Sequence, residues 1–201
     1  MKKSDLIISL ILGEIIAIFL FFILKSLNFV VFPLWLLFFV LPILALIGLY
    51  LAYLIGRKIQ VVFQFSKYAL VGFANTAVDF GVLNLLMLVT GIYSGKNIFL
   101  LNTVSFFVAM THSYIWNKLW AFKRKTKEKT GKEFLQFITV TILGAVINGG
   151  IVYFISTLVS PMFGVSNELW ANMAKIVATA VVIIWNFLGY KFIVFDSKKN
   201  E

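Results

Sequence analysis

Residues 98–125, "IFLLNTVSFFVAMTHSYIWNKLWAFKRK", join a long apolar run to an abrupt basic end. Within the run the titratable side chains are His112, Tyr114 and Lys118, and the triplet "KRK" follows at 123–125. An α-helix needs about 20 mostly apolar residues to cross the hydrocarbon core of a bilayer. The stretch therefore predicts a transmembrane helix whose tryptophan-rich end reaches the membrane surface, where aromatic belts are typical.

The composition of the whole chain also indicates a protein that is surrounded mainly by lipid and not by water. Of 201 residues, 61% are hydrophobic and 13% are charged, and the mean hydropathy is +0.98. A soluble domain carries roughly a quarter of its residues as charged side chains. The absence of cysteine excludes disulfides and thiolate chemistry, and a single histidine excludes a multi-histidine metal cluster. We expect neither a metal nor a cofactor.

Six apolar runs are long enough to span a membrane, at residues 6–27, 34–56, 68–90, 98–120, 134–158 and 170–192. The first resembles a signal peptide, but it is too long and lacks a small-residue cleavage site, so we expect a retained anchor. No ten-residue strand alternation is present. The sequence thus predicts an all-α integral membrane protein with six transmembrane helices.

The basic residues also predict an orientation. With the N-terminus in the cytoplasm, the cytoplasmic segments and inner helix ends hold all but three of the 18 lysines and arginines, the exceptions being Lys25, Lys96 and Lys175. Lysine and arginine concentrate on the cytoplasmic side of membrane proteins. We therefore expect both termini to be cytoplasmic. The net charge of +10 is explained by this orientation and by contact with anionic lipids, and not by nucleic acid.

Spans 3–4 and 5–6 resemble two copies of one hairpin. "FSKYALVGFANTAVDFG" (65–81) aligns with "FLQFITVTILGAVINGG" (134–150), which places Phe65 on Phe134. This alignment has an offset of 69 residues. For the second helix of each hairpin, the offset of 69 places "IWN" (115–117) on "IWN" (184–186). An offset of 73 instead aligns "SYIWNKLWAF" (113–122) with "NFLGYKFIVF" (186–195). We prefer the larger offset, because the outer loop of the second hairpin is about four residues longer. Duplicated hairpins of equal orientation predict an axis along the membrane normal.

These motifs resemble the GtrA-like membrane proteins. The positions that carry the resemblance are Phe65, Tyr68, Gly72, Thr76 and Asp79 in the first helix of the unit, then Asn117, Lys118, Trp120 and Phe122. The resemblance implies a four-helix domain over residues 62–196, preceded by a two-helix extension at 1–58 and followed by a cytoplasmic tail at 197–201. In the second hairpin Tyr190 and Ile193 depart from the family pattern.

The resemblance also implies a function in the synthesis of cell-surface polysaccharides. Such proteins are thought to flip a polyprenyl-phosphate-linked sugar, for example on undecaprenyl phosphate, across the cytoplasmic membrane of a bacterium or archaeon. Membrane glycosyltransferases then transfer the sugar to O-antigen, teichoic acid or arabinogalactan. We expect a non-enzymatic multi-pass protein of the cell membrane. A homodimer is left open, because six short helices are few to enclose a path.

Polar residues within the spans are the candidates for substrate contact, because they are costly there and often functional. The candidate set combines mid-span residues with residues at the cytoplasmic rim: Asn75, Thr76, Asp79, Asn102, Asn148 and Lys175, then Asn117, Lys118, Trp120 and Lys191. Asp79 and Lys175 would line a polar seam between the two hairpins. The rim lysines, Lys67 included, would collect the phosphate.

Each candidate has a structural alternative. Small and hydroxyl side chains such as Thr76 and Ser105 often serve helix packing and interhelical hydrogen bonds. Lysines at helix ends, and Lys175 beside the outer surface, often extend to the interface without binding a ligand. His112 is interpreted as a hydrogen-bonded packing residue.

Glu14, alone in the first span, and His112 are candidates for proton coupling. A proton-coupled small-molecule exporter is therefore one alternative function. A second alternative is a scaffold that recruits a glycosyltransferase and transports nothing.

Overall fold

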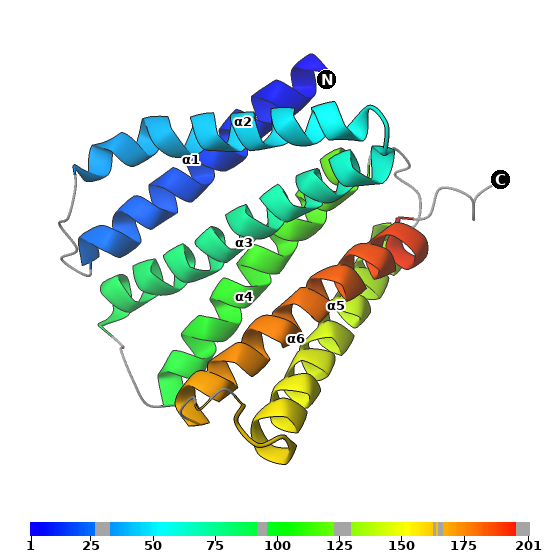
Figure 1. The fold of residues 1–201 in the computed structure, drawn as a ribbon. Coiled ribbons are helices and arrows are strands. Elements are labelled where there is room, and N and C mark those ends of the chain that lie inside the picture. The colour runs from blue at the N-terminus through cyan, green and yellow to red at the C-terminus, as the bar shows by residue number, and fades with distance from the viewer. Residues whose placement is uncertain (27–32, 92–95, 123–129, 163, 165–166, 196–201) are drawn as a thin grey trace. The chain divides into compact units, whose positions relative to one another are not determined.

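The computed structural model describes residues 1–26, 33–91, 96–122, 130–162, 164 and 167–195, and every regular element among them is helical. The order is α1 Lys3–Ser26, η1 Leu34–Leu36, α2 Leu37–Gly56, α3 Gln60–Thr90, α4 Lys96–Trp116, η2 Asn117–Ala121, α5 Thr130–Tyr153, η3 Phe154–Leu158, α6 Asn167–Gly189 and η4 Tyr190–Val194 (Figure 1). η1 is a 3₁₀-helix, and η2, η3 and η4 are π-helices. The all-α prediction is confirmed for this part of the chain.

Each predicted span corresponds to one of the helices α1 to α6. Among the described residues, three helices are long and apolar enough to cross a membrane, at Lys3–Lys25, Leu34–Gly56 and Gln60–Thr90, and Ala180–Val194 forms a shorter apolar helix. Many large apolar side chains on these helices are exposed, as expected for surfaces that face lipid. The chain is therefore a multi-pass membrane protein, and the orientation of its termini stays a prediction.

The chain divides into two compact units, residues 1–123 and 124–201. In the first unit α1 packs against α2 and α3, and α3 packs against α4 (Figure 1). Its buried cluster consists of Leu12, Leu49, Val71, Ala74 and Trp120. The two-helix extension is thus part of the same compact unit as the first hairpin.

Close packing of α1 on α2 depends on Gly13. A Cβ added at Gly13 would lie 2.5 Å from the Cα of Pro42, closer than carbon atoms approach without a shift of the backbone. Small residues at helix contacts allow this approach in membrane bundles, where association relies on packing because lipid supplies little hydrophobic drive.

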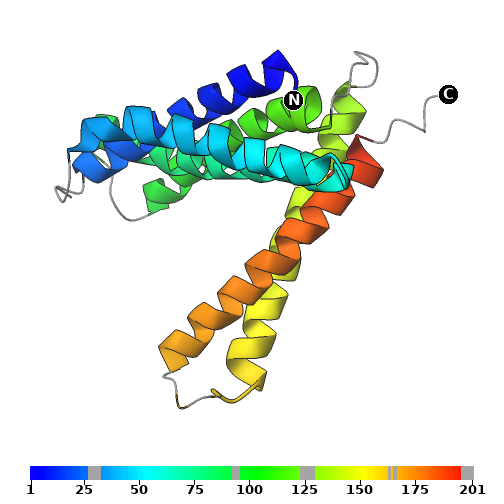
Figure 2. The same ribbon diagram turned by 45° about the horizontal axis from the view of Figure 1, so that its top comes forward.

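In the second unit α5 and α6 lie side by side as a hairpin (Figures 1 and 2). The indole Nε1 of Trp185 donates to the backbone carbonyl of Val140 at 3.1 Å. Gly189 lets the helices approach, since an added Cβ would lie 2.6 Å from the Val140 side chain. The Phe137 and Tyr190 rings stack with centroids 4.5 Å apart.

Both hairpins end in the same way. η2 and η4 are five-residue π-helices that begin at Asn117 and Tyr190, two positions that the larger offset aligns with each other. The phenylalanine that follows each π-helix, Phe122 or Phe195, donates its backbone N–H to the carbonyl of the first residue of that π-helix, at 2.9 and 2.8 Å respectively. Ring contacts repeat as well, with centroids 6.4 Å apart for Tyr68–Phe122 and 6.5 Å for Phe137–Phe195. Tyr68 and Phe137 are paired by the alignment of the first helices, and Phe122 and Phe195 are paired by the larger offset of the second helices. The duplication itself stays a prediction.

Candidate functional site

A buried ion pair lies where α1, α3 and η2 meet in the first unit. Asp5 and Lys67 are 2% and 1% exposed, and the Lys67 ammonium donates to Asp5 Oδ1. The same oxygen accepts from Trp120 Nε1 at 3.0 Å, and Asp5 Oδ2 accepts from the Lys2 backbone N–H at 3.1 Å. A charge is tolerated in such a setting only when it is paired and hydrogen-bonded. The pair therefore fixes the first helix to the third.

Aromatic rings complete the surroundings of the Lys67 ammonium. Its nitrogen lies 4.4 Å from the centroid of Phe63 and 5.3 Å from that of Trp120, within the range of cation–π attraction. Lys67, one of the rim lysines predicted to collect a phosphate, is buried, because Asp5 and these rings hold its charge inside the unit. Its contact with a phosphate stays a prediction. Trp120, another rim candidate, is 2% exposed and packs in the buried cluster of the first unit, so its contact with a substrate stays a prediction.

The other predicted rim residues of η2 are buried too. Lys118 is 8% exposed, and its ammonium donates to the Tyr114 hydroxyl at 3.2 Å. Asn117 is 1% exposed and donates to the Ser113 carbonyl at 2.9 Å. Both residues are therefore enclosed by the protein at this helix end. Contact with a substrate stays a prediction for them.

Midway along α3, Asp79 connects α3 to α4. Its Oδ1 accepts a hydrogen bond from the Ser105 hydroxyl at 2.8 Å, which agrees with the packing interpretation of Ser105. One turn earlier, the buried Oδ1 of Asn75 has no hydrogen-bond partner within the described part of the chain. Thr76 is exposed and donates to Gly72 of its own helix at 3.1 Å. Two of the three predicted polar residues of α3 are thus partly buried, and the third is exposed.

The candidates for proton coupling do not form a hydrogen bond in the described structure. Both ring nitrogens of His112 are buried without a hydrogen-bond partner among the described residues, and the ring packs against Trp116 at 6.3 Å. The expectation of a hydrogen-bonded histidine is therefore wrong within the described residues, where the contact of the ring is with the indole of Trp116. Glu14 is partly buried in α1.

The remaining candidates lie in the second unit or outside the described side chains. Lys191 of η4 is partly buried, with its ammonium 5.9 Å and 5.3 Å from the rings of Phe187 and Phe192. Asn148 of α5 is also partly buried. The side chains of Asn102 and Lys175 lie outside the described part. The predicted seam between Asp79 and Lys175 therefore stays a prediction.

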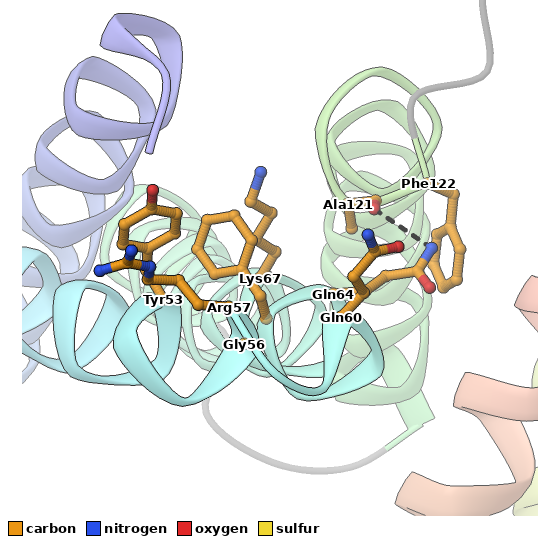
Figure 3. A pocket seen from close by; sticks show the side chains of 9 residues that line it. Tyr53, Gly56, Arg57, Gln60, Gln64, Lys67, Ala121 and Phe122 are labelled. Carbon is orange, nitrogen blue, oxygen red and sulfur yellow. Dashed lines mark hydrogen bonds between the residues drawn. The ribbon is translucent and has the colours of Figure 1, made fainter.

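A pocket of about 620 Å³ lies between the end of α2, the beginning of α3 and η2; we call it the polar pocket. Its lining consists of Tyr53, Gly56, Arg57, Gln60, Phe63, Gln64, Lys67, Ala121 and Phe122. Figure 3 shows Tyr53 and Arg57 on one side and Ala121 and Phe122 on the other. The Gln64 amide donates weakly across it to Ala121, at 3.5 Å. Arg57 is exposed, and the described residues supply no carboxylate to its guanidinium.

A second hollow of about 370 Å³, the apolar groove, lies between α2 and α3 with α1 contributing one residue. It is lined by Ile16, Leu41, Leu44, Ala45, Gly48, Leu49, Ser66, Ala69, Leu70 and Phe73. The single hydroxyl in this lining, that of Ser66, donates to the Phe63 carbonyl of its own helix at 2.9 Å. The groove therefore presents a hydrocarbon surface.

Sequence reasoning missed Asp5 and both hollows. One signal for the ion pair was present, since Asp5 is an isolated carboxylate near the start of the first span and Lys67 lies near the start of the third. The first and third spans enter the membrane from the same side in any hairpin arrangement. Opposite charges at equal depth on such helices can meet.

The model of the family described as "GtrA/DPMS, transmembrane domain" matches residues 67–195. The chain belongs to this family. A Bacillus subtilis (strain 168) protein described as "Uncharacterized membrane protein YngA" is 30% identical over 136 residues, which are 67% of this chain and 82% of that relative. No solved structure matches the chain.

The GtrA/DPMS match begins at Lys67, so the buried ion pair joins the family segment to the extension before it. Lys67 and Trp120 lie within the matched residues, whereas Asp5 lies outside them. Six of the nine residues that line the polar pocket also precede residue 67. At this end, the matched segment is therefore in contact with residues of the chain that precede the match.

Proposed function

We propose that the protein translocates a polyprenyl-phosphate-linked sugar across the cytoplasmic membrane, for glycosylation of a cell-surface polysaccharide. Membership of the GtrA/DPMS family supports a role in handling polysaccharide precursors. The protein acts without bond chemistry of its own. Its polar residues give a charged headgroup a lower barrier to crossing than lipid does.

One observation carries this proposal: Asp79, Asn75 and Ser105 gather midway along the α3–α4 pair. Polar residues at such depth are costly, and in membrane proteins they mark ion and substrate pathways. The Asn75 oxygen, buried and without a partner among the described residues, is an acceptor for a donor such as a sugar hydroxyl. Asp79 keeps one hydrogen bond, from Ser105, and has further acceptor capacity.

The proposed direction follows from charge. Lys2, Lys3, Arg57 and Lys58 are exposed at the end of the first unit where α1 begins and α2 ends, and Lys25 lies at the opposite end of α1. An excess of lysine and arginine favours the cytoplasmic side. The lipid-linked sugar therefore enters at the end that contains the polar pocket and leaves at the other.

The test is a flipping assay in vesicles that contain the purified full chain and a fluorescent polyprenyl-phosphate hexose. A membrane-impermeant reductant bleaches the probe only in the outer leaflet, so translocation appears as bleaching beyond the initial outer fraction. We expect Asp79→Asn to slow translocation about tenfold or more, since a charge-assisted interaction is worth one to two powers of ten. The matched control is Thr111→Val on α4, whose exposed hydroxyl bonds its own helix at 2.8 Å.

A wild-type chain that leaves half of the probe protected refutes translocation and favours the scaffold function. In that case a glycosyltransferase from the same cell should co-purify equally with wild-type and Asp79→Asn chains. Equal rates for Asp79→Asn and wild type would refute the role of the mid-span residues.

A further inference from the structure

We propose that the polar pocket and the apolar groove together form the loading site for a polyprenyl-phosphate lipid, with its phosphate and sugar in the pocket and its isoprenoid chain in the groove. This inference rests on the proposed function, since it names where the substrate binds first. It also gives the extension at residues 1–58 a function, because that segment supplies the α2 wall of both hollows.

The phosphate is recognised by Arg57. A guanidinium presents a planar fork of donors that matches two phosphate oxygens, and it stays charged at every physiological pH. Lys67 also lines the pocket, but Asp5 compensates its charge. Without that compensation two neighbouring cations would hold the phosphate more strongly. The ion pair therefore leaves a site with one uncompensated charge, which suits a ligand that must be released.

The remaining pocket residues fit a sugar. The volume of about 620 Å³ lies within the roughly 300–1,000 Å³ typical of small-molecule pockets, and a phosphate alone fills only a small part of it. The amides of Gln60 and Gln64 and the hydroxyl of Tyr53 can donate and accept hydrogen bonds with sugar hydroxyls. Phe122 supplies a flat apolar face (Figure 3), and the ring of Phe63 also belongs to the lining.

The apolar groove follows the pocket along the same two helices. On α2 the groove ends at Leu49 and the pocket begins at Tyr53, one helical turn later. On α3 the pocket is lined by residues within 60–67 and the groove by residues within 66–73, so the groove lies further along the same helix. Gly48 makes room in the groove, since an added Cβ would meet nothing within 4 Å. A polar hollow beside an apolar one selects a ligand with a charged head and a hydrocarbon tail.

Binding is measured on the purified full chain in detergent by native mass spectrometry, with undecaprenyl phosphate as the probe. Parallel samples contain undecaprenol, phosphatidylglycerol or inorganic phosphate. The first variant is Arg57→Gln, and its control is Lys58→Gln, which removes the neighbouring exposed charge outside the lining. The second variant is Gly48→Leu, which fills the groove. Its control is Gly150→Leu on α5, an equally open glycine.

We expect undecaprenyl phosphate to bind about tenfold more tightly than undecaprenol or phosphatidylglycerol, and inorganic phosphate not to compete. Arg57→Gln and Gly48→Leu should each weaken binding about tenfold, while both controls bind as the wild type does. Equal affinity for phosphatidylglycerol would identify the site as one for bulk anionic lipid and overturn the proposal. Unchanged binding in Arg57→Gln would overturn it as well.

The measurement involves no transport, so it separates this inference from the proposed function. Binding as expected, with no bleaching beyond the outer fraction in vesicles, would retain the loading site and refute translocation. Translocation by wild type and Arg57→Gln at equal rates, with no binding difference, would retain the function and refute the site.

Discussion

Removal of one partner of the Asp5–Lys67 pair should destabilise the first unit strongly. In Asp5→Asn the Lys67 ammonium, which is 1% exposed, keeps its aromatic neighbours but loses its carboxylate. Leaving a buried charge without its counter-charge costs about 3–5 kcal/mol. For a chain of this size each kcal/mol lowers the melting temperature by about 2–4 °C, so we expect a decrease of about 10 °C. Lys67→Met should cause a decrease of similar size.

The double variant Asp5→Asn with Lys67→Met is the decisive measurement. It removes both charges, so neither buried charge stays unpaired, and the asparagine oxygen can still accept from Trp120. We expect its melting temperature to lie well above that of either single variant, with a coupling free energy of about 3 kcal/mol or more. The assay is thermal unfolding of the purified chain in detergent, followed by tryptophan fluorescence.

Lys58→Met is the control for loss of a cation at the same helix end. Because Lys58 is exposed, its substitution should change the free energy of unfolding by less than about 0.5 kcal/mol. The buried pair would be refuted if the losses in free energy of unfolding of the two single variants simply added in the double variant. It would also be refuted if each single variant had the melting temperature of the wild type.

Two further predictions concern helix packing and use the same thermal assay. Gly13→Ala should lower the free energy of unfolding by about 1–3 kcal/mol, because its Cβ would lie 2.5 Å from the Pro42 backbone. The control is Gly48→Ala, which has open space around the added Cβ and should be neutral or stabilising. Equal melting temperatures of the two variants would contradict the close contact at Gly13. Tyr190→Phe should cost about 1 kcal/mol through loss of the 2.8 Å contact with the Thr141 hydroxyl, and an unchanged melting temperature would show that this bond contributes nothing.

The helices were predictable because hydropathy and length alone determine whether a segment can span a bilayer. The larger of the two offsets aligns Asn117 with Tyr190, and the π-helices η2 and η4 begin at these two residues. That these ends are π-helices was not predictable, because a single inserted residue in a helical turn has no signature in composition. The family, too, could be inferred from scattered positions of α3 and η2.

The contacts between helices were not predictable from the same information. Hydropathy does not specify how a helix is rotated about its axis, so the burial of Lys67 and Trp120 could not be predicted. The partner that draws them inward, Asp5, lies far before Lys67 in the sequence and outside the family segment. The polar pocket was missed for a related reason. Arg57 and Gln60 belong to a connection between helices, where charged and polar side chains are expected on any membrane protein.

The buried ion pair also has a consequence for how the chain is made. A ribosome delivers α1 to the bilayer before α3 exists, so the carboxylate of Asp5 arrives at the insertion machinery without the ammonium that later neutralises it. In a nascent chain that ends after α2, this carboxylate has no Lys67 with which to pair. Only the synthesis of α3 supplies the cation, so the contact between α1 and α3 forms after both earlier helices have been made.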